Sequence, residues 1–209
     1  MLLRSGDEPW ISSLGAWLHF KVMKKGFTLI ELLIVIGILA ILSTTVVLVL
    51  NPAQILAKSR DTQRISDLGS IQSALGLVLA TVPDPVAAFA FGWGPFVTVA
   101  TANKPFATSA PAITRTSRNV NGTGWVSVNM GLAPAGSPLS VLPIDPTNTI
   151  TYYYSYIAAS GPTYEIDGRL ESTDLRGNMA TDGGSANTCV TYVEITCYYE
   201  VGTAPGLLL

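Results

Sequence analysis

Hydrophobic and polar residues follow three different patterns along the chain, one after another. From Phe27 to Leu50 nearly every position is apolar, and Glu31 is the only charged residue. At ~1.5 Å per residue this run would form a helix of about 36 Å, long enough to cross a ~30 Å hydrocarbon core. The first pattern therefore predicts a single membrane-spanning helix over residues 27–50.

The second pattern, over residues 51–81, predicts an amphipathic helix. Apolar residues recur at intervals of three or four, as one face of a helix requires: Ile65, Leu68, Ile71, Leu75 and Val78. Charged residues occupy the positions between them, and we expect these on the polar side: Lys58, Arg60, Asp61, Arg64 and Asp67. The apolar stripe is expected to pack on a core.

Asn51-Pro52 separates the two helical patterns. Asparagine is a good helix cap and proline is favoured in a first helical turn, so the pair can begin a new helix. Inside a continuing helix Pro52 would instead produce a kink. A helical element from Thr28 to Thr81 would be ~80 Å long, more than an ordinary globular helix.

The third pattern begins after residue 82 and predicts a β-rich head over residues 82–209. Glycine, proline, serine and threonine become frequent there, and short apolar runs at 96–99 and 125–128 indicate strands. The clearest pair is 149–157 and 163–171, an antiparallel hairpin with a five-residue loop. A last pair of strands is expected at 190–195 and 198–201.

Alternation within that hairpin puts three tyrosines on one face of the expected sheet. These are Tyr152, Tyr154 and Tyr156, and we expect them to cover the helix or a neighbouring sheet face. The predicted fold class is therefore α+β, with a long N-terminal helix and a C-terminal antiparallel β-sheet head.

Composition supports a link to the membrane. Charged residues make up only 12 % of the chain, and the mean hydropathy is +0.41. A secretory signal peptide would have an apolar region of about 7–15 residues followed by a small-residue cleavage site. The run to Leu50 is longer and is followed by Asn51-Pro52 instead, so we favour a membrane anchor.

Basic residues before the apolar run predict its orientation. Lys21, Lys24 and Lys25 precede the run, which favours an N-terminus in the cytoplasm and a head outside it. Basic residues between 58 and 64 reduce this asymmetry. Residues 1–26 are interpreted as a leader, with Met23 as an alternative start, and the one histidine, His19, lies within it.

The segment KGFTLIELLIVIGILAIL, residues 25–42, resembles the N-terminus of type IV prepilins and of type II secretion pseudopilins. The shared pattern has basic residues, then Gly26-Phe27-Thr28, a glutamate five positions after the glycine, and an uninterrupted apolar run. The resemblance implies a pilin-like fold. Proline in such helices usually lies nearer the mature N-terminus than Pro52 does here.

The resemblance also implies a processing pathway. A membrane peptidase, the prepilin peptidase, would cut between Gly26 and Phe27 on the cytoplasmic side and methylate the new amino group of Phe27. An assembly platform would then extract the subunit from the membrane into a homopolymer with packed N-terminal helices. Glu31 would neutralise the α-amino group of an adjacent subunit.

Local chemistry offers a second role for Glu31. Thr28 to Glu31 fits a capping box, in which the Thr28 hydroxyl and the Glu31 carboxylate each bind a backbone amide at the helix start. After cleavage, however, the positive amine at Phe27 would need an opposite charge in a water-poor filament core. We favour assembly over capping, and both roles are compatible.

The only cysteines are Cys189 and Cys197, and an oxidising compartment outside the cytoplasm permits a disulfide between them. A straight strand would separate them by about 26 Å, whereas a disulfide needs Cα atoms within ~7 Å. The segment between them must therefore reverse, or the bond is absent or intermolecular. We favour an intramolecular disulfide that closes a tight hairpin.

The sequence offers little other chemistry. Asp174 and Asp182 lie in an acidic, glycine-bearing loop, at the place where the resemblance implies a calcium site in the major pseudopilin. The spacing of an EF-hand is absent, so a solvated turn is favoured and Ca²⁺ is kept as an option. No other cofactor is expected. The net charge of −2 disfavours nucleic-acid binding, which requires neutralisation of phosphates.

Three functions remain open at this point, and we favour a non-enzymatic one, because no catalytic constellation is found. The first is a structural subunit of a type IV pilus-like filament. The second is a pseudopilin of a type II secretion system. The third is a signal-anchored extracytoplasmic enzyme or binding domain that never polymerises. The expected location is the cytoplasmic membrane, followed by an extracellular or periplasmic filament.

Overall fold

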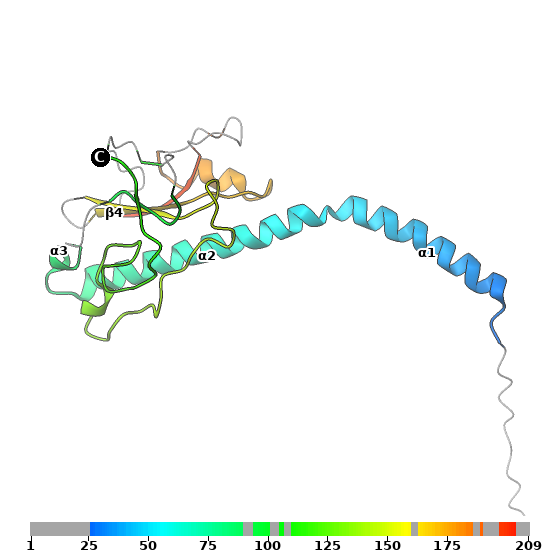
Figure 1. The fold of residues 1–209 in the computed structure, drawn as a ribbon, viewed down its shortest axis with the longest axis horizontal. Coiled ribbons are helices and arrows are strands. Elements are labelled where there is room, and N and C mark those ends of the chain that lie inside the picture. Colours follow the sequence, from blue (N-terminus) through cyan, green and yellow to red (C-terminus); the bar gives the residue numbers. More distant parts are fainter. Residues whose placement is uncertain are drawn as a thin grey trace, which may run out of the picture. The chain divides into compact units, whose positions relative to one another are not determined.

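A computed structural model of the chain describes residues 26–89, 94–100, 105–106, 110–159, 163–185, 189 and 197–203. It divides the chain into two compact units, Met1–Leu48 and Val49–Leu209. The first unit contains most of helix α1 (Leu29–Leu50), and the second contains helix α2 (Pro52–Thr81) together with the β-sheet (Figure 1).

Helix α1 is apolar on every side. All its described side chains are exposed to solvent, which is the pattern of a helix whose surroundings are a membrane or other helices. Its three hydroxyl side chains bond back to carbonyl oxygens one turn earlier, at 2.7–2.9 Å: Ser43, Thr44 and Thr45. These hydroxyls need no water, so the helix is suited to an apolar environment.

The helical pattern breaks at Asn51. This residue has φ 41° and ψ 75°, in the left-handed region, where asparagine is tolerated better than most side chains. Its side chain makes no capping hydrogen bond, but its carbonyl oxygen accepts bonds from the amides of Gln54 and Ile55. Pro52 is the first residue of α2, as its fixed φ favours. Asn51-Pro52 therefore begins a second helix.

The second unit contains a sheet of five strands within the described residues: β1 (Phe96–Val97), β2 (Ile113–Thr114), β3 (Ser155–Ala159), β4 (Thr163–Gly168) and β5 (Tyr199–Gly202). Their order is β2-β1-β3-β4-β5. The pairs are antiparallel except for β1 and β2, which are parallel. The α+β class is confirmed, whereas the sheet is mixed instead of wholly antiparallel.

Three short helical turns complete the described elements. Helix α3 (Pro85–Ala88) follows α2, and two 3₁₀ turns, η1 (Met130–Leu132) and η2 (Arg176–Ala180), lie in the long connections of the head. Asp84 caps α3, because its carboxylate accepts a bond from the amide of Ala87 at 3.1 Å. None of these turns was predicted from the sequence.

The core lies between α2 and one face of the sheet (Figure 1). From α2 come the apolar residues at helical spacing: Leu68, Ile71, Leu75 and Val78, all fully buried. The sheet contributes alternate residues of β3 and β4 and the residue just before β3: Tyr154, Tyr156, Tyr164 and Ile166. Tyr154 also donates a hydrogen bond to Asp67 of α2 at 2.9 Å. The apolar stripe predicted for residues 51–81 is thus the face that packs on the sheet.

The hairpin of β3 and β4 lies where the sequence predicts it, but β3 begins only at Ser155. Tyr154 and Tyr156 share the core with α2, as expected. Tyr152 lies before the strand, half-buried, with the Arg64 guanidinium 4.8 Å from its ring centroid. The three tyrosines therefore do not form one stripe, because the chain turns at 149–152 before pairing begins.

The other strand predictions have mixed outcomes. Residues 96–97 form β1, but residues 125–128 are irregular and all buried. Trp125 is anchored there by its indole N–H, which donates to the Pro143 carbonyl at 3.0 Å. Because residues 125–128 are all buried, their burial does not alternate as it does along a half-buried strand. The predicted segment 198–201 corresponds to β5, whereas 190–195 lies outside the described residues.

The polar side expected for α2 is wrong at two positions. Arg64 and Asp61 are fully buried and form part of a network of ion pairs. Arg64 binds both carboxylate oxygens of Asp145, at 2.7 and 3.1 Å, and contacts Glu171 at 2.8 Å. Asp61 accepts bonds from the backbone amides of Glu171 and Ser172. The network ties α2 to two distant loops of the head.

The guanidinium of Arg64 also controls the ionisation of its partners. Burial alone would raise the pKa of Asp145, but Arg64 and two backbone amides hold it below its ordinary value. Burial would likewise raise the pKa of Glu171, and Arg60 and Arg64 together lower it. Both carboxylates are therefore ionised partners of Arg64 at neutral pH.

Replacing Arg64 should destabilise the head strongly. Arg64→Met keeps the apolar stem but leaves buried carboxylates without their cation, which typically costs about 3–5 kcal/mol. Lys58→Met on the same helix removes only the exposed ion pair with Asp174 and should cost less than about 1 kcal/mol. Urea unfolding of the full chain in detergent, monitored by tryptophan fluorescence, measures the loss of unfolding free energy in both variants. Equal stability of the two variants would contradict the assignment.

Candidate functional site

The expected cleavage site lies just before α1. Residues 26–28 precede the helix without regular structure, and all three are exposed. A Cβ added to Gly26 would meet nothing within 4 Å, and the Phe27 side chain is 80 % exposed. A peptidase needs an accessible, extended bond, and glycine disfavours extension of the helix across it by ~1 kcal/mol relative to alanine. Gly26-Phe27 is accessible and lies outside the helix.

Thr28 caps the start of α1. Its hydroxyl accepts a hydrogen bond from the amide of Glu31 at 3.2 Å, which satisfies one of the free N–H groups of the first turn. A complete capping box would also have the Glu31 carboxylate bind the Thr28 amide. Within the described residues this carboxylate has no hydrogen-bond or ion-pair partner. Capping is thus achieved by Thr28 without the charge of Glu31.

Beyond Glu31 the surface of α1 consists of apolar side chains without a break. The segment Leu29–Val47 is long and apolar enough to cross a membrane, with a mean hydropathy of 2.6, and none of it is buried within the described structure. Glu31 lies in the first turn of this helix, where a negative charge interacts favourably with the helix dipole. The site therefore combines an accessible bond, a capped helix start and one carboxylate at the edge of an apolar surface.

The structure gives Asp174 and Asp182 separate partners. Asp174 forms an exposed ion pair with Lys58 at 2.9 Å. Asp182 is half-buried, and its two oxygens accept bonds from the amides of Gly184 and Glu200. In the part of the chain that the structure describes, the candidate metal-binding group of three residues includes neither aspartate.

Cys189 and Cys197 are joined by a disulfide, with their Cα atoms 5.1 Å apart. Cys197 is buried against Leu170 and Met179, next to the start of β5. The tight hairpin expected between the cysteines covers residues 190–196, which lie outside the described residues. The bond brings the segment at 189 to the edge of the sheet.

The disulfide predicts a measurable loss of stability on removal. A Cys189→Ser, Cys197→Ser double variant should lose about 2–3 kcal/mol of unfolding free energy, because a short closed loop no longer restricts the unfolded chain. Alkylation of the native protein with and without reductant, read by mass spectrometry, reports the bond itself. Two alkylated thiols in the unreduced protein would contradict an intramolecular bond.

Sequence reasoning missed a group of buried acids in the sheet. Glu165, Asp167 and Glu200 lie together on β4 and β5. Burial raises the pKa of Asp167 well above its ordinary value, and the negative charges of Glu165 and Glu200 raise it further. The alternation of acidic and apolar residues in β4 is the signal that could have revealed them, since it puts both acids on one face.

Comparison with known proteins supports the first of these sites. Residues 22–47 match the family model described as the prokaryotic N-terminal methylation motif. Neither the curated proteins nor the solved structures contain a match. The matched segment includes Gly26, Phe27, Thr28 and Glu31 and most of the apolar helix. The chain therefore carries the prepilin-type signal that is the hallmark of type IV pilin and pseudopilin precursors.

Proposed function

We propose that this chain is the structural subunit of a type IV pilus-like filament. Prepilin peptidase cuts the precursor after Gly26, the new amino group of Phe27 is methylated, and α1 then packs against the α1 helices of other subunits. One observation carries the proposal: α1 exposes apolar side chains on every side and has a single carboxylate at its start, which has no partner among the residues that the structure describes.

Electrostatics explain why that carboxylate matters. Cleavage creates a positive amine at Phe27, four residues before Glu31. Among packed helices little water remains, so each charge needs an opposite charge nearby. A neighbouring subunit displaced along the filament axis can bring its amine to Glu31. The pair then neutralises two charges and sets the axial offset between subunits.

The precursor is a membrane-anchored protein whose partners follow from this pathway. Lys21, Lys24 and Lys25 favour an N-terminus on the cytoplasmic side, where the peptidase would act on Gly26-Phe27. The head folds outside the cytoplasm, in a compartment where the disulfide of Cys197 is stable. An assembly platform in the membrane then moves the subunit into an extracellular filament.

A pseudopilin of a type II secretion system is the second candidate. It would use the same α1 chemistry but build a short periplasmic fibre. The loop at residues 182–184 favours it, because the resemblance implies a calcium site at this place in the major pseudopilin. The loop follows the β3–β4 hairpin, and the bond from the Glu200 amide to Asp182 holds it against β5. The third candidate, an anchored binding domain, would leave the apolar surface of α1 in the membrane.

Isolation of surface filaments distinguishes the three candidates. Filaments are sheared from cells, imaged by electron microscopy and digested for mass spectrometry. If the chain is a pilus-like subunit, the filaments should be built of it, and their digest should contain peptides from residues 27–209. A protein confined to the periplasm, with a secretion defect when it is deleted, would identify a pseudopilin. A protein that remains a single subunit in the membrane would contradict both filament functions.

A further inference from the structure

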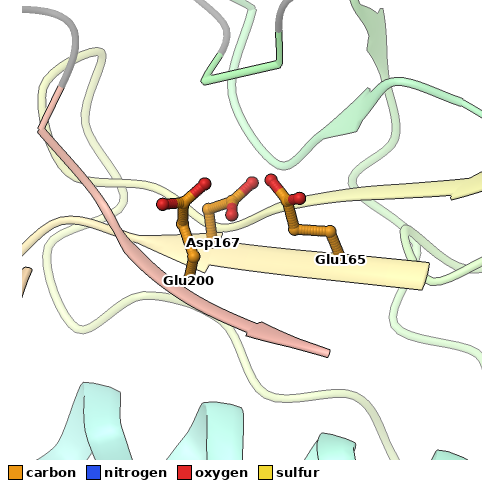
Figure 2. Close-up of side chains that lie close together, drawn as sticks. All are labelled: Glu165, Asp167 and Glu200. Carbon is orange, nitrogen blue, oxygen red and sulfur yellow. The ribbon is translucent and has the colours of Figure 1, made fainter. Parts of the chain in front are cut away.

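Three carboxylates lie side by side on the face of the sheet that points away from α2 (Figure 2). Glu165 and Asp167 are alternate residues of β4, and Glu200 is the partner of Asp167 across the β4–β5 pair. One oxygen from each lies within 4.8 Å of the others, and all three residues are at most 1 % exposed. The strands therefore hold three acidic groups at one buried point.

Asp167 provides an independent sign that a ligand is needed there. Its Oδ2 accepts a hydrogen bond from Ser155 at 3.2 Å, but its Oδ1 is buried and has no hydrogen-bond partner among the described residues. The Asp167 side chain points into the group, between Glu165 and Glu200 (Figure 2). Buried polar atoms are almost always satisfied, so an oxygen in this position indicates an absent partner.

The loop beside β5 fits closely against the same group. Asp182 accepts a hydrogen bond from the backbone amide of Glu200 at 2.9 Å and fixes the start of the strand. A Cβ placed on Gly184 would collide with the carboxylate of Glu200, so this position leaves no room for a side chain. The backbone at Gly184 thus packs directly against the Glu200 side chain and restricts where its carboxylate can lie.

We propose that Glu165, Asp167 and Glu200 bind one Ca²⁺ ion between β4 and β5. Carboxylate oxygens are the ligands that this hard cation prefers, and it holds them at about 2.3–2.6 Å. Two oxygens on one Ca²⁺ can thus be up to about 5.2 Å apart, which accommodates the observed spread of 4.8 Å. Mg²⁺ holds its oxygens at about 2.0–2.1 Å and would require a tighter group.

The ion would complete what the protein leaves open. It neutralises like charges that repel one another in a buried place, and it gives the Asp167 Oδ1 a partner. It also links β4 to β5 and to the loop at Asp182, near the disulfide of Cys197. The site belongs to the head and is independent of the chemistry of α1, so it can fail while the proposed filament function holds.

Calorimetric titration of the full chain tests the site. The detergent-solubilised protein is treated with EDTA, exchanged into metal-free buffer and titrated with CaCl₂. We expect one ion per chain with a Kd of about 10⁻⁴–10⁻³ M, the range of extracellular modules. At free Ca²⁺ about ten times the Kd, the Tm should rise by roughly 3–6 °C. No saturable binding by the folded protein would overturn the proposal.

Matched variants assign the binding to these residues. Asp167→Asn and Glu165→Gln keep the side-chain shape but remove one charged ligand, and each should weaken Ca²⁺ binding at least about tenfold. Asp174→Asn removes an exposed carboxylate elsewhere in the head and should bind like the original chain. If one variant fails to fold, the other carries the test.

The outcomes separate the site from its competitors. Unchanged binding in both Asp167→Asn and Glu165→Gln, or lost binding in Asp174→Asn, would place the ion elsewhere and overturn the proposal. A proton shared by Asp167 and Glu165 is the competing way to relieve the charge. In that case the original chain binds no Ca²⁺, while Asp167→Asn is more stable than the original chain in EDTA.

Discussion

Glu31→Gln subunits should be cut after Gly26 and remain in the membrane, yet form few or no filaments. Glutamine keeps the size of the side chain but removes its charge, so the amine of a neighbouring Phe27 would be buried without a partner. Such a loss costs about 3–5 kcal/mol at each contact, repeated along the filament. Insertion itself should become easier, because a charged side chain is unfavourable in an apolar span.

The matched control for this experiment is Thr28→Ala. It removes the hydroxyl that accepts the Glu31 amide and weakens the helix start by about 1 kcal/mol, while the carboxylate stays. We expect Thr28→Ala subunits to assemble. Filament yield measured by electron microscopy, with membrane fractions blotted for the mature subunit, separates charge from capping. Normal yield from Glu31→Gln with loss in Thr28→Ala would favour capping.

Gly26→Leu should block processing altogether. The precursor would accumulate in the membrane with residues 1–26 attached, and no filaments would form. A bulky side chain occupies the space that is open next to the bond and favours continuation of the helix through it. Immunoblots of membranes from cells with the peptidase should show only the larger, uncut form.

Gly37→Leu provides the corresponding control. Gly37 is also in open space, but it lies within α1 and away from the bond. This variant should therefore be cut like the original chain, whatever its effect on helix packing. Cleavage of Gly26→Leu at the normal rate would show that the peptidase acts at another bond.

The parts of the fold that depend on local sequence were predictable. The apolar run gives α1, and the spacing of Leu68, Ile71 and Leu75 gives the buried face of α2. The hairpin of β3 and β4 follows from β-forming residues on either side of a short loop. In each case the neighbours that determine the structure lie within a few positions along the chain.

The remaining features depend on residues far apart in sequence. Arg64 is charged and was expected at the surface, but its partner Asp145 lies 81 positions away. The spacing of residues within α2 contains no information about that partner. The two-residue strands β1 and β2 are similarly too short for periodicity to reveal them. Their pairing instead rests on backbone hydrogen bonds between distant segments, such as the bond from the Ile113 amide to the Pro95 carbonyl at 2.8 Å.

The two candidate sites differ in the same way. Gly26, Phe27 and Glu31 lie within one short segment, so their pattern alone identified the processing signal that the family model matches. Glu200 reaches Glu165 and Asp167 only because β5 pairs with β4. From the sequence alone, an acidic residue on one strand is predicted to be an ordinary surface residue, because its neighbours on the adjacent strand are not known.

Terminal mass spectrometry of the subunit in purified filaments tests cleavage and methylation at Gly26-Phe27 most directly. We expect a chain that begins at N-methyl-Phe27 and contains the Cys189–Cys197 disulfide. The N-terminal peptide of the assembled subunit, sequenced by fragmentation, identifies both the cut and the added methyl group. Assembled subunits that still contain residues 1–26 would contradict processing at Gly26-Phe27 and the use of the Phe27 amine in assembly.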